Sequence, residues 1–222
     1  MTDVEIRVLD EPAEAAGALL AEAALAGANL ALSGGSTVGR AYEIAARLRT
    51  SWRDVHVWFG DERAVPPDDE RSNYRLVCES LLPSLESAPI VHRIQGEQSA
   101  EAAAALYDGE LAGVVLDLAL NGIGPDGHTA SLFPHAESLE ETERRAVAAE
   151  AGLEPFVARV TLTRPVFAAC DLLVYLVTGE GKAEGSRHAF AAEPSAATPA
   201  SLVRGRRTIA LLDSAAASLL DA

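Results

Sequence analysis

The residue with the clearest chemical potential is His128, which follows a glycine-rich break in an apolar stretch. Residues 117–120 form an apolar, strand-like run, and Asn121, three glycines and Asp126 separate this run from the histidine. In open parallel α/β sheets such a break puts polar side chains at the carboxyl edge of the sheet, where ligands bind. An imidazole with an ordinary pKa of ~6.5 can take a proton from water at neutral pH. The stretch predicts that His128 is a general base, with a structural histidine as the alternative.

A second glycine-rich turn, SGGST at residues 33–37, separates a short apolar strand from a helical pattern. Gly34 and Gly35 let the backbone approach a phosphate without Cβ clashes. Ser36 and Thr37 add hydroxyl donors at the positive end of the following helix. The turn predicts phosphate or sugar binding, and the alternative is an ordinary strand-to-helix turn with a serine N-cap.

Charged side chains accompany the other apolar strands. Asp61, Glu62 and Arg63 come directly after one strand. Arg159 lies inside another, and Lys182 follows a glycine turn after a third. Because an unpaired charge at a buried edge is costly, these groups must pair with one another or with a ligand. The pattern leaves both interpretations open: internal salt bridges with an exposed lysine, or contacts to a bound anion.

Hydrophobic periodicity predicts the elements that position these residues. Strands are predicted over residues 4–9, 30–32, 55–59, 90–94, 117–120, 157–162, 172–177 and 208–212. Helices are predicted over residues 12–26, 38–48, 72–82, 99–111, 137–149, 182–190 and 214–220, with loops at 66–71, 152–155 and 191–201. The alternation of strands and helices predicts one α/β domain over residues 1–222.

The composition narrows the class of protein. The 222 residues, 49% of them hydrophobic, suffice for one substantial core. The formal charge of -15 repels nucleic acid and anionic lipid, so neither is an expected partner. Cys78 and Cys170 lie in apolar contexts typical of free thiols in a reducing compartment. The sequence has neither an apolar signal core at its start nor a run of the ~18 apolar residues that a membrane span needs, so we expect a cytoplasmic protein.

Several familiar motifs are excluded by their context. Gly122, Gly124 and Gly127 spell G-x-G-x-x-G, but no helix starts within them and no acidic strand end follows, as dinucleotide binding requires. The GEGKA run at residues 179–183 lacks the leading glycine and the Ser or Thr of a P-loop. No histidine pair has the spacing of a helical zinc site, and there is no G-x-S-x-G elbow. We therefore expect no metal and no organic cofactor.

Six segments, in order along almost the whole chain, resemble the 6-phosphogluconolactonase family. They are LALSGGST (30–37), WFGDERAVP (58–66), SNYRL (72–76), GIGPDGHTASLFP (122–134), RVTLT (159–163) and TGEGKA (178–183). The resemblance implies a Rossmann-like, mostly parallel sheet with helices on both faces. It also implies a phosphorylated sugar lactone as substrate and hydrolysis of its ring ester to 6-phosphogluconate, the second step of the oxidative pentose phosphate pathway.

The larger group that this family belongs to includes glucosamine-6-phosphate deaminase, which is the main alternative. Deaminases resemble DEY where residues 61–63 read DER, and they carry an acidic FNEP turn where residues 132–134 read LFP. Amino-sugar isomerisation needs extra carboxylates to move protons, whereas lactone hydrolysis needs one base and support for the carbonyl oxygen. Arg164 departs from the lactonase pattern, which has an apolar residue before Pro165. A non-catalytic sugar-phosphate sensor is a further alternative, but it would not need His128.

The resemblance implies a role for each candidate residue. The phosphate is expected on a set of glycine, hydroxyl and cationic groups: Gly34, Gly35, Ser36, Thr37, Lys182 and Arg159. His128 is expected to deprotonate the attacking water, with Asp126 orienting its imidazole. Either Arg63 or a glycine N–H of residues 122–127 is expected to stabilise the oxyanion. Asp61 is expected to contact the substrate.

Overall fold

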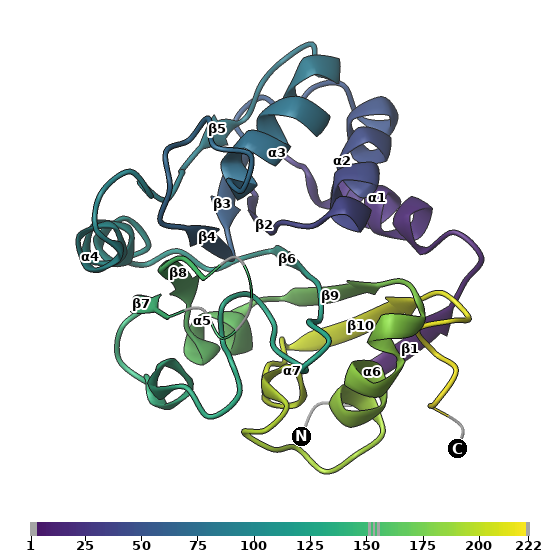
Figure 1. Cartoon of the computed structure of the whole chain (residues 1–222). Coiled ribbons are helices and arrows are strands. Elements are labelled where there is room, and N and C mark those ends of the chain that lie inside the picture. The colour runs from purple at the N-terminus through teal and green to yellow at the C-terminus, as the bar shows by residue number, and fades with distance from the viewer. Residues whose placement is uncertain (1–3, 151, 153, 155, 221–222) are drawn as a thin grey trace.

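A sheet of seven parallel strands forms the centre of the computed structural model, which describes all residues except 1–3, 151, 153, 155 and 221–222 and the side chain of Ser36. The strand order is β1-β10-β9-β6-β2-β3-β5 (Figure 1). The strands are β1 (Val4–Val8), β2 (Asn29–Leu32), β3 (His56–Phe59), β5 (Ile90–Val91), β6 (Leu118–Asn121), β9 (Leu172–Val177) and β10 (Arg207–Leu212). The central strands are almost fully buried, as expected of a parallel sheet covered by helices.

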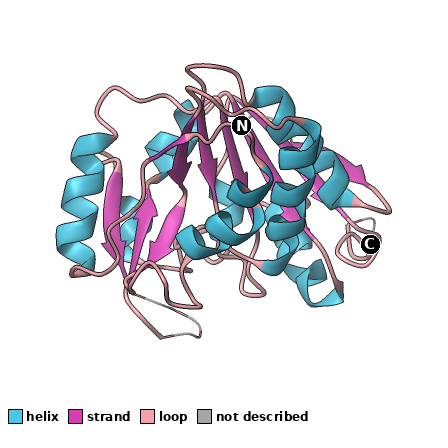
Figure 2. Ribbon diagram, turned by 90° about the horizontal axis from the view of Figure 1, so that it is seen from above, coloured by secondary structure: helices cyan, strands magenta, loops and turns pink. Residues whose placement is uncertain are grey.

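Helices cover both faces of this sheet (Figures 1 and 2). They are α1 (Pro12–Ala23), α2 (Ser36–Leu48), α3 (Asn73–Ser80), α4 (Ala100–Glu110), α5 (Arg164–Ala169), α6 (Ala183–Phe190) and α7 (Pro199–Leu202), with 3-10 turns at Leu82–Ser84, Glu137–Glu140 and Glu180–Lys182. Helices α1, α2 and α3 lie on one face, and α5, α6 and α7 lie on the other (Figure 1). The α/β class with a mostly parallel sheet, predicted from the sequence, is confirmed.

A smaller antiparallel sheet, in the order β4-β8-β7, adjoins the larger one. Its strands are β4 (Asp61–Arg63), β7 (Ala146–Ala149) and β8 (Arg159–Leu162), and α4 packs beside it. The chain enters β4 directly from β3 through Gly60, whose N–H still donates to the carbonyl of Leu32 in the larger sheet. The sequence analysis predicted β8 but neither β4 nor β7. The pairing of β4 with β8 sets Arg63 opposite Arg159.

The carboxyl ends of β2 and β6 lie side by side at the point where the strand order reverses. After β2 the chain continues through α2 to β3 on one side, and β6 is followed on its other side by β9. Leu30 pairs with Leu118 and Ala31 with Ala119, so the SGGST turn and Gly122 leave the sheet at the same edge. In open α/β sheets the connections diverge at such a point and leave a crevice that binds ligands.

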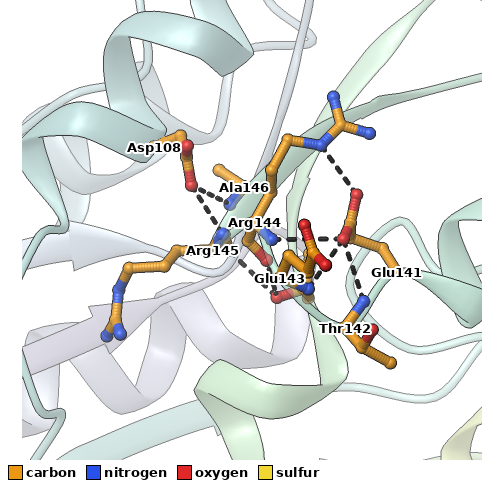
Figure 3. A network of polar contacts seen from close by, with 8 residues as sticks. Asp108, Glu141, Thr142, Glu143, Arg144, Arg145 and Ala146 are labelled. Atoms are coloured by element: carbon orange, nitrogen blue, oxygen red, sulfur yellow. Dashed lines mark hydrogen bonds and ion pairs between the residues drawn. The ribbon is translucent and has the colours of Figure 1, made fainter.

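The helix predicted over residues 137–149 is wrong. Only Glu137–Glu140 forms a short 3-10 turn, and Ala146–Ala149 is a strand. Figure 3 shows the reason: a Glu141 carboxylate oxygen accepts hydrogen bonds from the backbone N–H groups of residues 142, 143 and 144, and Asp108 of α4 accepts from those of residues 145 and 146. These side chains take the donors that a helix would use, so the chain extends and pairs with β8.

Other differences from the predicted elements are small. Residues 214–220 form successive turns rather than a helix, and the Asp213 carboxylate before them accepts from the N–H groups of Ala216 and Gly179. The predicted loop at 191–201 includes the start of α7, and the predicted turn at 152–155 lies partly outside the described residues. Cys170 is buried as expected, whereas Cys78 is only half-buried, and both are free thiols. Within the described residues, no helix combines the length and apolarity of a membrane span.

Candidate active site

The SGGST turn is fixed to the sheet through Ser33. The Ser33 N–H donates to the Tyr42 hydroxyl at 2.9 Å, and that hydroxyl donates back to the Ser33 carbonyl at 2.7 Å. The Ser33 Oγ donates to the carbonyl of Leu120 in β6 at 2.7 Å. Gly35 then begins α2 with a φ of 122°, a conformation that residues with a Cβ rarely adopt. Thr37 shares a hydrogen bond of 2.8 Å with Thr178 at the end of β9. The turn therefore holds the N-terminus of α2 rigidly at the crevice.

His128 is held by the glycine-rich turn that follows β6. The Gly124 N–H donates to the His128 carbonyl at 2.8 Å, and the Gly127 N–H donates to the Gly124 carbonyl at 3.0 Å. A Cβ on Gly124 would overlap the imidazole, so glycine is required for this approach. The ring also packs against Phe133, with 4.7 Å between the ring centroids. The imidazole is thus fixed on two sides and keeps 22% of its side chain exposed.

Asp126 determines which imidazole nitrogen is free. Its Oδ1 lies 2.6 Å from His128 Nδ1 and also accepts from the His128 backbone N–H at 3.1 Å. Burial raises the pKa of Asp126, but the hydrogen bonds and charge of His128 outweigh it and leave this pKa below its usual value. At neutral pH the carboxylate is therefore ionised and can only accept, so Nδ1 carries the proton. The lone pair of Nε2 is then available to accept a proton.

Two arginines face each other across the smaller sheet. Arg63 lies opposite Arg159, which is only 5% exposed and stacks over Phe133 with its guanidinium carbon 5.9 Å from the ring centroid. Burial and the charge of Arg63 lower the pKa of Arg159, while the nearby carboxylates of Asp61 and Glu62 oppose this effect. Directly opposed like charges are destabilising in a sheet, so an anion between them would be stabilising.

The two carboxylates beside Arg63 differ in role. Glu62 accepts four hydrogen bonds, from the backbone N–H groups of Arg63, Asn73 and Tyr74 and from the Ser72 hydroxyl, and so anchors the start of α3. Burial nevertheless raises its pKa. Asp61 accepts from the Asn73 amide at 3.1 Å and from Ser131 Oγ at 2.6 Å. The internal salt bridge considered for residues 61–63 is not formed between Glu62 and Arg63, since Glu62 binds backbone donors instead.

These groups surround two adjoining cavities at the crevice. The first, of about 170 Å³, is lined by Ser33, Gly34, Asp61, Arg63, Asn73, Gly122, Ile123, Gly124, His128, Ala130, Arg159 and Lys182. The second, of about 180 Å³, is lined by Gly34, Gly35, Thr37, Val38, Gly122, Ile123, Leu176, Val177, Thr178 and Lys182. Each exceeds the ~10–15 Å³ that one water needs by about tenfold, which is the scale of a small ligand. Gly34 and Lys182 line both cavities, so the two spaces adjoin.

Lys182 is the cation common to both cavities. It ends the 3-10 turn Glu180–Lys182 that follows β9, and its side chain is half-buried. Burial lowers its pKa, and the charge of Asp126 partly opposes this effect. Within the part of the chain that the structure describes, the ammonium group has neither a hydrogen-bond nor an ion-pair partner. A partly desolvated cation of this kind is suited to an anionic ligand.

The structure brings most of the predicted site residues together. Gly34, Asp61, Arg63, His128, Arg159 and Lys182 line the first cavity, and Gly35 and Thr37 line the second. Asp126 is hydrogen-bonded to His128. The side chain of Ser36 lies outside the described residues. Three further residues, Asn73, Ser33 and Thr178, line the cavities but were not predicted as site residues. Asn73 lay at the predicted start of a helix and in the SNYRL segment, and no pattern of residue types marked it as a ligand-binding residue. Among the described residues, no three His, Cys, Asp or Glu side chains gather as metal ligands would.

Comparison with known proteins identifies the family. The family model described as glucosamine-6-phosphate isomerases/6-phosphogluconolactonase matches residues 5–211. The chain belongs to this family. Among its members, a 6-phosphogluconolactonase of Rhizobium meliloti is 40% identical over 182 residues, covering 78% of this chain and 77% of that protein. A 6-phosphogluconolactonase of Aggregatibacter actinomycetemcomitans is 36% identical over 166 residues, 71% of each protein.

Solved structures of family members extend this similarity to the fold. The 6-phosphogluconolactonase from Trypanosoma cruzi superposes with a TM-score of 0.84 at 26% identity, over 100% of this chain and 99% of that chain. A monomeric glucosamine-6-phosphate deaminase superposes with the same TM-score of 0.84 at 20% identity, over 98% and 100% of the two chains. Because both kinds of family member share the architecture, the fold alone does not separate the two activities.

Proposed function

We propose that this protein hydrolyses 6-phospho-D-glucono-1,5-lactone to 6-phospho-D-gluconate, with His128 as general base. The observation that carries the proposal is the convergence of Gly34, Lys182 and His128 on one cavity. An anion cradle and a proton acceptor thus lie within reach of one small molecule. The relatives named 6-phosphogluconolactonase, at 33% to 40% identity, support the choice of substrate.

The phosphate occupies the second cavity. Gly34, Gly35 and Thr37 present the N-terminus of α2, where backbone N–H groups and the helix dipole favour an anion. Lys182 closes this cavity with an ammonium group that has neither a hydrogen-bond nor an ion-pair partner among the described residues. Arg159 acts as the second cation from the first cavity. The phosphate thereby positions the sugar ring in the cavity that contains His128.

His128 then activates water. Nε2 removes a proton from a water molecule as its oxygen attacks the lactone carbonyl carbon, and negative charge develops on the carbonyl oxygen. When this tetrahedral intermediate collapses, the bond between the carbonyl carbon and the ring oxygen breaks. The imidazolium returns its proton to the departing ring oxygen, which becomes a hydroxyl, and the carboxylic acid ionises. Asp126 stabilises the imidazolium while the charge exists, as an ionised hydrogen-bond partner does.

Arg63 is the group that we assign to the oxyanion. Of the glycines in residues 122–127, Gly124 and Gly127 both donate their N–H groups within their own turn, so the alternative donor is the N–H of Gly122. Arg63 lines the cavity, and one of its five N–H donors holds the carbonyl of Arg71 at 2.6 Å. That contact fixes the guanidinium and leaves further donors for the carbonyl oxygen, which is the geometry that favours electrostatic stabilisation.

A direct assay separates this proposal from its alternatives. Freshly generated 6-phosphogluconolactone is mixed with the protein, 6-phosphogluconate formation is followed against a blank without protein, and glucosamine 6-phosphate is tested in parallel for ammonia release. We expect lactone hydrolysis well above the blank and no ammonia. Ammonia release without lactone hydrolysis would identify a deaminase. Binding of 6-phosphogluconate with neither reaction would identify a non-catalytic sensor.

A further inference from the structure

Asn73 is a buried polar residue of the first cavity that the mechanism above does not use. It is the first residue of α3, lines the cavity together with Gly34 and His128, and is 2% exposed. Within the described residues, its side-chain oxygen Oδ1 is buried without any hydrogen-bond partner. A buried acceptor is costly to leave unsatisfied, and most such groups in folded proteins are paired.

The surrounding residues fix the orientation of this amide. Asn73 Nδ2 donates to the Asp61 carbonyl at 2.8 Å and to Asp61 Oδ1 at 3.1 Å. The backbone N–H of Asn73 donates to Glu62 Oε1 at 2.8 Å. Turning the amide over would set Oδ1 against two acceptors of Asp61, which is repulsive. The nitrogen therefore stays on Asp61, and the oxygen is the atom left for a ligand.

The oxygen lies directly at the SGGST turn. A Cβ built on Gly34 would overlap Asn73 Oδ1, so the glycine is what allows the amide to approach the turn. Gly34 lines both cavities, which places Oδ1 near their junction, between the anion cradle and His128. At this point Asn73 Oδ1 would contact the middle of a ligand that spans the two cavities.

We propose that Asn73 Oδ1 accepts a hydrogen bond from a ring hydroxyl of the phosphorylated lactone and so determines specificity for a hydroxylated sugar. This inference rests on the proposed function. An amide oxygen can only accept, whereas the phosphate and the lactone carbonyl have no proton to donate. The ring hydroxyls are the donors of the substrate. A site built to bind a substrate hydroxyl discriminates strongly against an analogue that lacks it, because the buried acceptor is then unpaired.

The test compares four substrates. The parent lactone and its 2-deoxy, 3-deoxy and 4-deoxy analogues are generated enzymatically from the corresponding sugar phosphates, and kcat/KM is measured for the native protein and for Asn73→Ala. We expect the native protein to disfavour one deoxy analogue by about tenfold or more. Asn73→Ala should lose about tenfold on the parent and on the other two analogues, but less than about twofold on that one, as a double-mutant cycle requires of a direct contact.

Two further variants separate contact from structure. Asn73→Ser keeps a polar group for Asp61 but no longer reaches the cavity, so we expect the same substrate pattern as for Asn73→Ala. It serves as the test variant if the alanine variant does not fold. Ser72→Ala removes the hydroxyl that caps α3 and binds Glu62, yet it leaves Asn73 Oδ1 in place. It should keep the native order of preference among the four lactones.

The outcomes are distinguishable. Equal losses on all four substrates in both Asn73 variants, or no loss on the parent, would overturn the role of Asn73 while leaving the proposed function intact. If the native protein hydrolyses none of the four lactones above the blank, the proposed function itself fails. A loss confined to one hydroxyl position identifies the group that Asn73 recognises.

Discussion

Replacing Asp126 by Asn tests the tautomer argument at the base. Asp126 Oδ1 holds His128 Nδ1 at 2.6 Å and the His128 backbone N–H at 3.1 Å, and an asparagine oxygen can accept both bonds. The substitution therefore keeps the position of the imidazole and the proton on Nδ1. What it removes is the negative charge that faces the imidazolium formed when His128 takes a proton from water. A change in kcat in this variant therefore measures the effect of the Asp126 charge and not that of its hydrogen-bond geometry.

The magnitude follows from the type of bond that is changed. A hydrogen bond to a charged group contributes about 1.5–3 kcal/mol, against about 0.5–1.5 kcal/mol for a neutral pair. The carboxylate and the imidazole are 26% and 22% exposed, so solvent screens the pair and the lower end of the difference applies. A loss of about 1 kcal/mol lowers kcat roughly fivefold. Asp126→Ala, which removes the whole bond, should cost roughly 10 to 100-fold, and His128→Ala about 10²–10⁴-fold.

The assay is 6-phosphogluconate formation from fresh lactone over a range of pH, corrected for spontaneous hydrolysis. Without the carboxylate the imidazolium is less stable, so kcat of Asp126→Asn should be lower than that of the native protein throughout the pH range. Asp108→Asn is the matched control, because Asp108 also accepts from two backbone N–H groups but lies in the network of Figure 3 away from the cavity. Its activity and pH profile should stay native.

Two results would refute this reasoning. An Asp126→Asn variant with native kcat would mean that the carboxylate does not act through the imidazole. A variant whose kcat falls as far as that of His128→Ala would mean that the substitution moved His128 instead of changing its charge environment. Circular dichroism and thermal unfolding of both Asn variants verify that the fold is retained.

Three further predictions follow from the same geometry. Because burial lowers the pKa of Lys182 and only its charged form attracts phosphate, the affinity for 6-phosphogluconate measured by calorimetry should fall as the pH rises, and this fall should begin below the pH at which an ordinary lysine loses its proton. Lys182→Arg, which stays protonated, should abolish that fall. Gly34→Ala forces Asn73 to move, so it should cost about 1–3 kcal/mol in the free energy of unfolding by urea denaturation and reduce kcat/KM, and native values of both would contradict the proximity of these residues. Burial raises the pKa of the Cys170 thiol to about 12, so a disulfide reagent at mildly alkaline pH should modify Cys78 rapidly and Cys170 only after unfolding, as thiol counting by mass spectrometry would show.

The parts of the molecule that periodicity predicted correctly are those whose structure is local. The apolar strands β2, β6 and β9 and the glycine turns after them stood out because parallel strands buried on both faces are continuous apolar runs. Helix α3 lies within the predicted range 72–82, and it is capped by Ser72, whose Oγ accepts from the Arg75 N–H. Such features depend on neighbours in sequence.

What the sequence could not predict depends on partners far away in the chain. Residues 145 and 146 were assigned to a helix, but Asp108, nearly 40 residues earlier, takes their N–H groups. Similarly, β4 is too short to be recognised by alternation, and only its pairing with β8 makes it a strand. The free oxygen of Asn73 also arises from such partners, since both hydrogens of its amide are directed at Asp61.

The smaller sheet explains how a fold shared with a deaminase can favour lactone hydrolysis. Because β4 pairs with β8, Arg63 and Arg159 stand opposite each other in the first cavity, and Lys182 adds a third positive charge. A protonated amino sugar would bring a further cation into this field, whereas a neutral lactone brings only its phosphate and a developing oxyanion. Glu62 is not free to carry protons for a deaminase reaction, since it accepts three hydrogen bonds from the start of α3 and a fourth from the Arg63 N–H. The charge around the cavity thus favours chemistry in which negative charge develops.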